Sequence, residues 1–572
     1  MKVQEFKGDK LIIKKRDMKR FGLLMVLGMV GMSALAVPAR PGIWKLLQLK
    51  DGTEVRAQLK GDEFRHSWVA ADGRHYVKVG DGYERLDEEM IGRRGASRRA
   101  AAEASVKARR VTPGSHTHFT GKKKGVVILA EFADVSFKSG NTLEKYKKIL
   151  NTEGYTSNEG FKGSVADYFK AQSGGQFEVE FDVFGPVKLK HERSYYGEND
   201  EDGNDMRVEE MIVEACRGVN SQANFSDYDW DGDGEVDEVY VVYANKAEAD
   251  GGGENTIWPH MYALEWTNTD IYLDGVRINT YACSNELDYN GKITGIGSFC
   301  HEFSHCLGYV DLYDTVNDTE VTFGSYDLMD SGCYNGNSFK PAGYSAYEKW
   351  MAGWIELTEL SNKDVVVKGL APVSEGGGGY IIYNDGHRDE YFILENRQQT
   401  NWDAHIPGVG LMITHVDFDP TIWELNIPNS ILDKTSYYVT TYYYPTNDHC
   451  RLNLVRADNS TKSSYNSMKN DLYPYESRDS LTATSKPAAK FFNVNKQDDK
   501  LMHGAVLHIT QNRDGSMDFV YRSPETDTGI REVQTGMNRT SSAIYDLQGR
   551  RVTEDVLRKG IYIVDGKKVV KE

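Results

Sequence analysis

The pattern of hydrophobic positions predicts strands and helices in the central part of the chain. Val126 to Ala130 is an uninterrupted apolar run, typical of a buried strand. Residues 177–189 alternate apolar and polar positions as strands do, and residues 205–216 have the period of an amphipathic helix. Ser164 to Asp167 forms a capping box that predicts the start of another helix. Mixed strands and helices predict an α/β or α+β unit over residues 111–355.

The pattern changes on both sides of this unit. Residues 356–522 contain short strand-like runs separated by Gly-, Asn- and Asp-rich turns, which predicts an all-β sandwich. Residues 37–110 carry Asp-Gly turn signals between short strands and end in a basic, alanine-rich stretch. Such a stretch is usually a solvated linker, but its position also suits a processing site. Residues 523–572 combine a Ser- and Thr-containing linker with a small β-type segment.

The N-terminal residues have the pattern of a secretory signal peptide. Residues 21–37 form an uncharged run that follows Lys14, Lys15, Lys19 and Arg20, and Ala34 to Ala36 closes it as an A-x-A cleavage site. We therefore expect residues 1–36 to be removed. A membrane anchor is the alternative, but the run is short for a span and has no positive stop after it. After cleavage we expect no stable membrane span.

Composition narrows the possible functions. The 572 residues suggest several domains, and a formal net charge of −17 argues against nucleic acid as the main partner. Six cysteines are too few for a disulfide scaffold in a chain of this length. Cys300 and Cys306 bracket a candidate metal-binding helix, so a bridge between them is one possibility and buried free thiols are the other.

Residues 301–311 carry the strongest chemical motif. His301 and His305 are four residues apart, so on an α-helix they point the same way and can reach one Zn²⁺. Glu302 projects from the same helix toward water on that metal. Gly308 can end the helix in a left-handed conformation. Asp311 could then return as a third ligand and leave one position open for water, as in a catalytic zinc site.

Chance explains this motif poorly. A random HExxH in such a chain has a probability of roughly a few per cent, and the added Gly and Asp lower it to the order of one in ten thousand. Asp314 is the fallback third ligand if the turn after the helix is longer. In the zinc mechanism, Glu302 takes the proton of a zinc-activated water and delivers it to the leaving amine.

A second motif lies in residues 229–237. Asp229, Asp231, Asp233 and Asp237 hold positions 1, 3, 5 and 9 around a glycine, as in the first part of an EF-hand calcium loop. Position 12 is Tyr240 instead of a glutamate, so the segment is no EF-hand. The four aspartates are candidate ligands of a structural Ca²⁺, with a plain acidic turn as the alternative.

The zinc motif resembles the metzincin signature, and residues 301–314 look most like the immune inhibitor A-type metallopeptidases of bacteria. Ser304 stands where that group usually has glycine. Residues 324–332 resemble the methionine turn beneath the metal, with Met329 as the matching residue. Some metzincins have a tyrosine two residues after this methionine that stabilises the oxyanion. Ser331 stands at that position here, so the resemblance assigns no residue to oxyanion stabilisation. Tyr334 and Tyr344 are read as core or rim.

The flanking regions extend the resemblance. Residues 61–66 resemble the propeptides of the same group, which have to keep a secreted peptidase latent. Because residues 37–110 contain no cysteine, the candidate latch residues are Asp62, Glu63, His66 and His75, with Asp62 and His66 favoured; assisting folding is the alternative role. The C-terminal residues resemble the sorting segments of the type IX secretion route, with a small accessory β-module as the alternative.

Together these observations predict an α+β protein with a metzincin-like zinc peptidase domain, an all-β sandwich domain, a small β-type propeptide and a small β C-terminal segment. The resemblance implies a secreted or cell-surface bacterial zinc endopeptidase, made as a zymogen, that acts on extracellular proteins. Secretion machinery is a possible partner. The rival hypothesis is a calcium-binding surface adhesin with a vestigial zinc site. Retention of Glu302 beside both histidines weighs against it, because an inactive site need not keep the base.

Overall fold

We describe the fold from a computed structural model of the chain. Most of residues 1–36, where a signal peptide is predicted, the basic stretch before residue 119 and most of the residues after 524 lie outside the described residues. The structure describes residues 35–87, 90–91, 119–200, 203–317, 322–436, 439–440, 444–460, 466–524, 544–546, 551–552, 559–564 and 567–571.

A six-stranded sheet organises the central unit, with the order β1-β10-β13-β9-β7-β8. The four strands from β13 to β8 run parallel, whereas β10 pairs antiparallel with β13 and β1 pairs antiparallel with β10. The predicted buried strand at 126–130 is confirmed within β7, and the alternating run at 177–189 forms one long strand, β8. The strands are β1 Leu35–Ala36, β7 Gly121–Glu131, β8 Phe177–Lys188, β9 Val239–Lys246, β10 His260–Ala263 and β13 Thr280–Leu287; a separate hairpin joins β11 Ile271–Leu273 and β12 Val276–Ile278.

Helices pack on this sheet and complete its core. The Ser164–Asp167 capping box is present at the start of α5, where the serine side chain and the aspartate side chain cap each other's backbone. The predicted helix at 205–216 forms α7, three residues later than predicted. Helices α4 and α5 contact β8, and α8 contacts β13 and β10. The helices are α4 Leu143–Asn151, α5 Val165–Gln172, α6 Arg193–Tyr196, α7 Val208–Val219, α8 Gly297–Cys306 and α9 Ala346–Met351.

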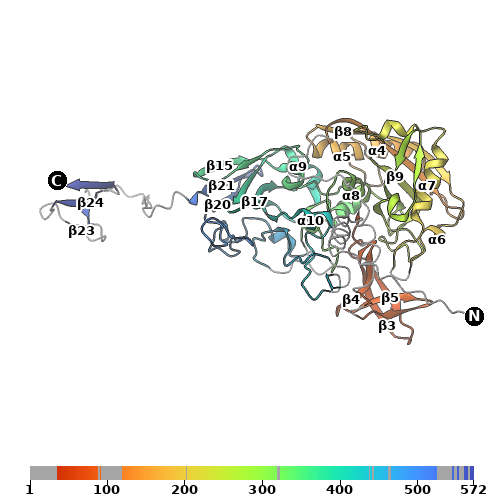
Figure 1. Cartoon of the computed structure of the whole chain (residues 1–572), viewed down its shortest axis with the longest axis horizontal. Coiled ribbons are helices and arrows are strands. Elements are labelled where there is room, and N and C mark those ends of the chain that lie inside the picture. Colours follow the sequence, from red (N-terminus) through yellow and green to blue (C-terminus); the bar gives the residue numbers. More distant parts are fainter. Residues whose placement is uncertain are drawn as a thin grey trace, which may run out of the picture.

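The N-terminal segment forms a separate antiparallel sheet in strand order, as its turn signals predicted. Figure 1 shows this sheet, labelled there at β3, β4 and β5, below the central unit. Its strands are β2 Trp44–Gln48, β3 Glu54–Asp62, β4 Arg65–Ala70, β5 His75–Val79 and β6 Gly82–Arg85.

Two further sheets follow the central unit and share one apolar core. Ile382, Phe392 and Ile413 from the larger sheet belong to the same buried cluster as Val506 and Phe519 from the smaller one. One short helix, α10 Pro420–Glu424, interrupts the strands, so the region is not all-β. The sheets have the orders β14-β16-β17-β18-β19 and β15-β21-β20. Their strands are β14 Leu357–Glu359, β15 Val365–Leu370, β16 Gly379–Asn384, β17 His387–Arg397, β18 Gly410–Asp417, β19 Leu452–Leu454, β20 Ala505–Gln511 and β21 Met517–Arg522.

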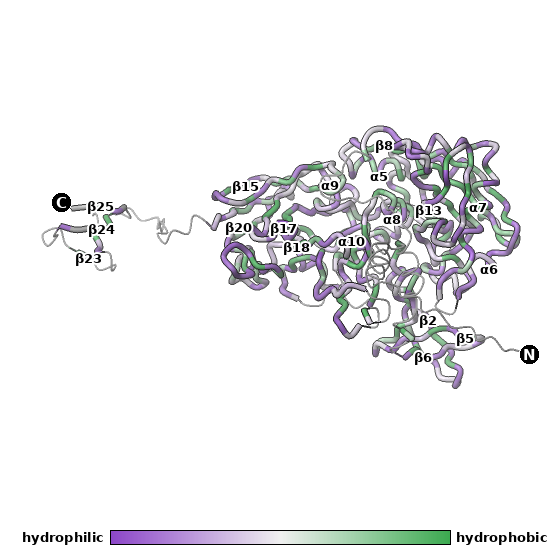
Figure 2. Tube along the Cα trace, viewed as in Figure 1, coloured by the Kyte–Doolittle hydropathy of each residue, from purple (hydrophilic) through white to green (hydrophobic). Residues whose placement is uncertain are grey.

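A small four-stranded sheet ends the chain, with the order β23-β22-β24-β25. Figure 2 shows hydrophobic positions gathered inside the central unit and the two sheets that follow it, with hydrophilic positions along the outer loops. Within the described residues, no helix combines the length and apolarity that crossing a membrane requires. The last strands are β22 Ile544–Tyr545, β23 Arg551–Val552, β24 Gly560–Val564 and β25 Lys567–Lys571.

Candidate metal centre

Helix α8 brings the two histidines of the central motif together. The helix is buried along nearly its whole length, and the rings of His301 and His305 lie 4.8 Å apart between centroids. Gly308 follows with a φ of 86°, and its backbone N–H donates to the carbonyl of His305. A left-handed residue here ends the helix and turns the chain back. As a result, Asp311 Oδ1 lies 3.1 Å from His301 Nε2 and 3.5 Å from His305 Nε2.

The three side chains fit a tetrahedral zinc ion. Two atoms that bind one tetrahedral zinc at about 2.0–2.1 Å lie about 3.3 Å apart, close to the distances from Asp311 to the two histidines. His301 Nε2, His305 Nε2 and Asp311 Oδ1 are buried and have no well-aligned hydrogen bond in the structure. A buried polar atom without a partner is costly, and a metal ion would satisfy all three at once. Asp314, the fallback ligand, instead accepts hydrogen bonds from the backbone N–H groups of Val316 and Asn317.

The remaining atoms of the ligand side chains are held by hydrogen bonds. His301 Nδ1 lies 2.8 Å from the carbonyl of Leu328, and His305 Nδ1 lies 2.8 Å from that of Tyr309. A hydrogen bond at Nδ1 fixes the tautomer that leaves Nε2 free to bind a metal. Leu328 precedes Met329, which is fully buried and accepts a hydrogen bond from the Leu312 N–H through its carbonyl. Residues 328 and 329 are thus bonded both to His301 and to Leu312, the residue after Asp311.

Asn426 holds Asp311 from a distant part of the chain. Its amide Nδ2 donates to Asp311 Oδ2 and its Oδ1 accepts from the Asp311 backbone N–H, both at 2.7 Å. Asn426 follows α10 with a φ of 52°, a left-handed conformation that asparagine tolerates better than most residues. Figure 1 shows α10 next to α8 at the junction of the central unit with the later sheets. Sequence reasoning missed this residue, because nothing in its neighbourhood indicates a contact 115 positions away.

Glu302 is fully buried beside the ligands. Burial, reinforced by the Asp311 carboxylate, raises the pKa of Glu302 well above its usual range. Burial opposes ionisation of Asp311 too, but attraction to His305 and contact with His301 keep the pKa of Asp311 below its usual range. Burial lowers the pKa of His305, which favours the neutral imidazole that binds metals. One Glu302 oxygen, Oε1, accepts a 2.7 Å hydrogen bond from the Val37 N–H.

Val37 belongs to a segment that crosses this centre. Strand β1, immediately before it, adds to the edge of the central sheet, and Trp258 Nε1 donates to the Val37 carbonyl. Residues 38–44 continue along a cavity of about 1130 Å³ that is also lined by Tyr313, Ser331 and Tyr334. The N-terminal segment therefore contacts Glu302 at Val37 and then continues along this groove.

Asp62 lies beside this groove, His66 lines a separate pocket, and neither is among the grouped ligands. Asp62 Oδ2 is 3.4 Å from the Tyr313 hydroxyl, and His66 Nε2 is 3.3 Å from a carboxylate oxygen of Glu248. Glu63, another candidate, approaches Asp205 and His260 in a second buried group. The contact with Glu302 comes from the Val37 backbone, which the sequence did not single out.

The aspartate-rich loop has a different environment. Asp229, Asp231 and Asp233 gather their carboxylates within 4.8 Å, but the last two are exposed. Asp229 accepts hydrogen bonds from the backbone N–H groups of Gly232, Asp233 and Gly234, so the loop satisfies these oxygens itself. Asp237 lies outside the group and accepts from the Trp230 N–H at 2.5 Å.

The six cysteines are all free thiols in the structure. Cys300 and Cys306 do not form the bridge that their positions suggested. The Cys306 thiol instead contacts a carboxylate oxygen of Glu238. The free-thiol alternative therefore describes them, with Cys300 buried and Cys306 only partly buried.

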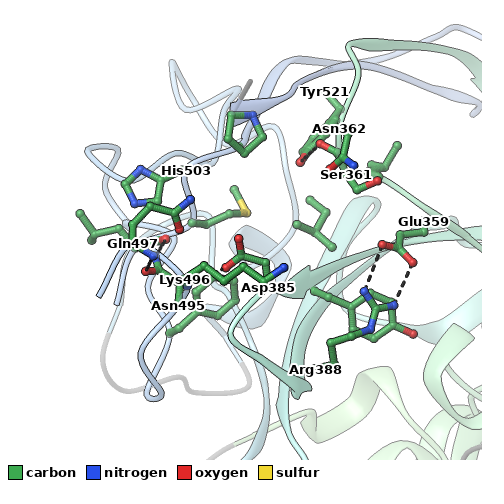
Figure 3. Close-up of a pocket in the computed structure, with 18 residues that line it drawn as sticks. Glu359, Ser361, Asn362, Asp385, Arg388, Asn495, Lys496, Gln497, His503 and Tyr521 are labelled. Carbon is green, nitrogen blue, oxygen red and sulfur yellow. Dashed lines mark hydrogen bonds and ion pairs between the residues drawn. The ribbon is translucent and has the colours of Figure 1, made fainter. Parts of the chain in front are cut away.

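A second pocket lies far from the zinc motif in sequence and has a different character. Figure 3 shows its residues, which come from the two sheets after the central unit and from the segment before β20, with Arg388 joined to Glu359 by two hydrogen bonds. The pocket has a volume of about 240 Å³. Its lining includes none of the residues of the zinc motif.

Two imidazoles, a carboxylate and an adjacent buried glutamate define the class of metal-dependent hydrolases that activate water. Residues 118–356 match the immune inhibitor A peptidase M6 catalytic domain. The protein is a metalloendopeptidase, and this segment is its catalytic domain. The family implies zinc, which the His301, His305 and Asp311 group fits. No curated protein matches the chain.

Proposed function

We propose that this protein is a secreted zinc-dependent endopeptidase of extracellular proteins and is made as a zymogen. Zinc is held by His301, His305 and Asp311, and Glu302 acts as general base and then general acid. The observation that carries this proposal is the convergence of three buried ligand atoms beside a buried glutamate.

The chemistry follows from the positions of these groups. When bound, zinc lowers the pKa of its water to about 7 and polarises the scissile carbonyl. Glu302 accepts a proton from the attacking water and returns it to the leaving nitrogen as the carbon–nitrogen bond breaks. The hydrogen bonds at Nδ1 keep both imidazoles oriented, and Asn426 keeps the Asp311 carboxylate in place.

Zymogen latency is supported by the segment that contacts Glu302. The Val37 N–H donates to one carboxylate oxygen of Glu302, the proposed general base, and residues 38–44 continue along the cavity beyond it. A cut after Ala36, as the signal-peptide pattern predicts, would leave the Val37 amino group at Glu302. Residues 37–110 then act as the propeptide until cleavage in the basic stretch after residue 92 releases them.

Latency has a direct test. The precursor that begins at Val37 should not digest casein, and trimming near Arg93-Arg94 or Arg109-Arg110 should release activity. Full activity of an uncleaved precursor, verified by mass spectrometry, contradicts a role of residues 37–110 in latency.

Location and accessory roles are part of the proposal. Residues 1–36 would direct export, residues 356–522 would form a β-sandwich packed on the catalytic domain, and residues 523–572 would carry a sorting segment read by secretion machinery. The shared apolar core of the two sheets supports the sandwich. Asp229, Asp231 and Asp233 would hold a structural Ca²⁺, and Asp237 would support the loop through the Trp230 N–H.

One assay separates the proposed enzyme from a surface adhesin with a vestigial site. The activated protein is incubated with casein or gelatin, with and without a zinc chelator, and zinc is then restored. We expect chelation to abolish cleavage and zinc to restore it. A zinc-loaded, trimmed protein that digests neither substrate supports the adhesin.

A further inference from the structure

Residues 35–40 lie in the groove as an extended peptide. Leu35 pairs with Met261 and Ala36 pairs with His260, antiparallel to the edge strand β10. Beyond this pairing, Trp258 Nε1 donates to the Val37 carbonyl at 2.9 Å. Addition of a strand to an exposed sheet edge is a general mode of peptide recognition, because it pairs main-chain groups of any sequence.

One peptide bond of this segment is held at both ends by side chains of the active site. The nitrogen of the Ala36–Val37 bond donates to Glu302 Oε1 at 2.7 Å. The carbonyl oxygen of the same bond accepts a hydrogen bond of 2.5 Å from the Tyr313 hydroxyl. The proposed general acid therefore lies at the nitrogen that must be protonated, and a hydrogen-bond donor lies at the oxygen that must gain negative charge.

We propose that Ala36–Val37, a bond that the signal-peptide cut would already have broken in the exported protein, marks the position of a substrate's scissile bond, and that Tyr313 is a catalytic residue that stabilises the oxyanion. This assignment rests on the proposed peptidase function and deepens it. It gives the oxyanion role to a tyrosine two residues after Asp311, whereas the position two residues after Met329 holds Ser331.

The step is ordinary hydrolysis, with water as the second reactant. Oxygen of water bonds to the carbonyl carbon, its proton passes to Glu302, and the carbonyl electron pair moves to the oxygen that faces Tyr313. Collapse of this intermediate re-forms the carbonyl and breaks the bond to nitrogen, which takes the proton from Glu302. The Tyr313 hydrogen bond strengthens as the oxygen gains charge, so it stabilises the transition state more than the bound substrate.

The propeptide also contacts Tyr313 from a second direction. Asp62 Oδ2 lies 3.4 Å from the same hydroxyl. Asp62 belongs to the segment expected to leave on activation, so its loss leaves the hydroxyl to the substrate carbonyl. Asp62, the favoured latch residue, therefore contacts the proposed oxyanion donor Tyr313 and not the metal ligands.

The bound segment indicates which peptides fit the groove. Ala36 is 1% exposed and Val37 is fully buried, so the two subsites around the scissile bond enclose a small residue and a β-branched aliphatic one. Arg40, further along, forms a buried ion pair with Asp250 and donates to Ser338 Oγ. We infer a preference for Ala before the scissile bond, Val after it, and Arg at the fourth position after it.

The first experiment tests the register. The activated full-chain enzyme is given the peptide Leu-Ala-Val-Pro-Ala-Arg, extended by two glycines at each end, and products are identified by mass spectrometry. We expect one cut, between Ala and Val. A matched peptide with Leu in place of that Ala should be cut at least 10-fold more slowly. Cleavage at another bond, or no cleavage while casein is digested, overturns the register.

The second experiment tests Tyr313 through a matched pair of variants. Tyr313→Phe should lower kcat by about 10²–10³-fold with KM, zinc content and melting temperature close to wild type. Tyr334→Phe is the control, since its hydroxyl donates to the Pro38 carbonyl, one residue beyond the bond, and its loss should raise KM instead. An unchanged kcat in Tyr313→Phe overturns its catalytic role, as does a rise in KM alone.

Failure of the Tyr313 assignment can be distinguished from failure of the proposed peptidase function. A wild-type enzyme inactive on casein and on the peptide removes the peptidase function itself, and the assignment of Tyr313 with it. If Tyr313→Phe loses zinc or unfolds, the cleavage map decides: a single cut between Ala and Val supports the register, and any other cut overturns it.

Discussion

The α8 centre and the aspartate-rich loop both have the residue pattern of a metal site, yet the structure gives them opposite environments. His301 Nε2, His305 Nε2 and Asp311 Oδ1 face one another in the protein interior without well-aligned hydrogen bonds. In the loop, by contrast, Asp229 is bonded by backbone N–H groups of its own turn, and Asp231 and Asp233 are exposed.

This difference separates two kinds of evidence for a metal. Buried ligand atoms that lack partners carry a desolvation cost, which the fold tolerates only if another group satisfies them. Exposed carboxylates in a tight turn have no such cost, since water and the backbone already solvate them. The same number of candidate ligands therefore supports zinc strongly at α8 and calcium only weakly at residues 229–233.

The largest expected effect separates metal binding from catalysis at α8. Glu302→Ala should keep stoichiometric zinc but lose about 10²–10⁴-fold in kcat on a peptide substrate, because the base acts on the proton and does not hold the ion. His305→Ala should lose the zinc itself, measured by atomic absorption after dialysis. A Glu302→Ala enzyme that digests casein at the wild-type rate would falsify the mechanism.

A smaller effect is expected from the residue that holds Asp311. Asn426→Gly removes both side-chain hydrogen bonds while preserving the left-handed backbone, so zinc affinity should fall about 10–100-fold. Asn459→Gly is the matched control, because Asn459 has a φ of 59° but is exposed and belongs to no metal group in the described part of the chain. Competition with a fluorescent zinc chelator measures both. Equal zinc affinity in Asn426→Gly and wild type rules out its positioning role.

Asn426 also shows where sequence reasoning stops. The spacing from His301 to Asp311 was readable because one helix and one glycine turn decide it, and local geometry follows from local sequence. Asn426 and Val37 reach the same centre from 115 and 265 positions away. Contacts of that kind depend on how whole sheets pack, which no local period encodes.

The fold shows the same limit. The buried strand at 126–130, the capping box at Ser164 and the N-terminal turns follow from period and turn chemistry, and the structure has them. Strand β1 does not follow from such local patterns, because the sequence of residues 35–36 is typical of the end of a signal peptide. Their pairing with β10 depends on an unpaired sheet edge formed by residues more than 200 positions later.

A substitution at matching glycines compares the two sites directly. Gly308 has a φ of 86° and Gly232 has a φ of 76°, so alanine at either position should cost about 1–2 kcal/mol in the free energy of unfolding. Only Gly308→Ala should also weaken zinc binding, because its turn returns Asp311 to the histidines. Urea unfolding and zinc titration of both variants measure this. Weaker zinc binding in Gly232→Ala would show that the two sites are coupled.

The smallest effect concerns calcium at the aspartate-rich loop. An ion that binds only the folded protein stabilises it by about 1.4 kcal/mol at ten times its Kd, or a rise of about 3–6 °C in Tm for a domain of 150–250 residues. That rise should vanish in the double variant Asp231→Ala/Asp233→Ala, whose carboxylates belong to the exposed group. Asp514→Ala is the control, since Asp514 caps a similar exposed turn through the Ser516 N–H and should leave the calcium response intact. Differential scanning calorimetry of zinc-loaded protein, with and without Ca²⁺, measures all three. An identical wild-type melting curve in both conditions removes calcium and leaves a turn that its own backbone N–H groups stabilise.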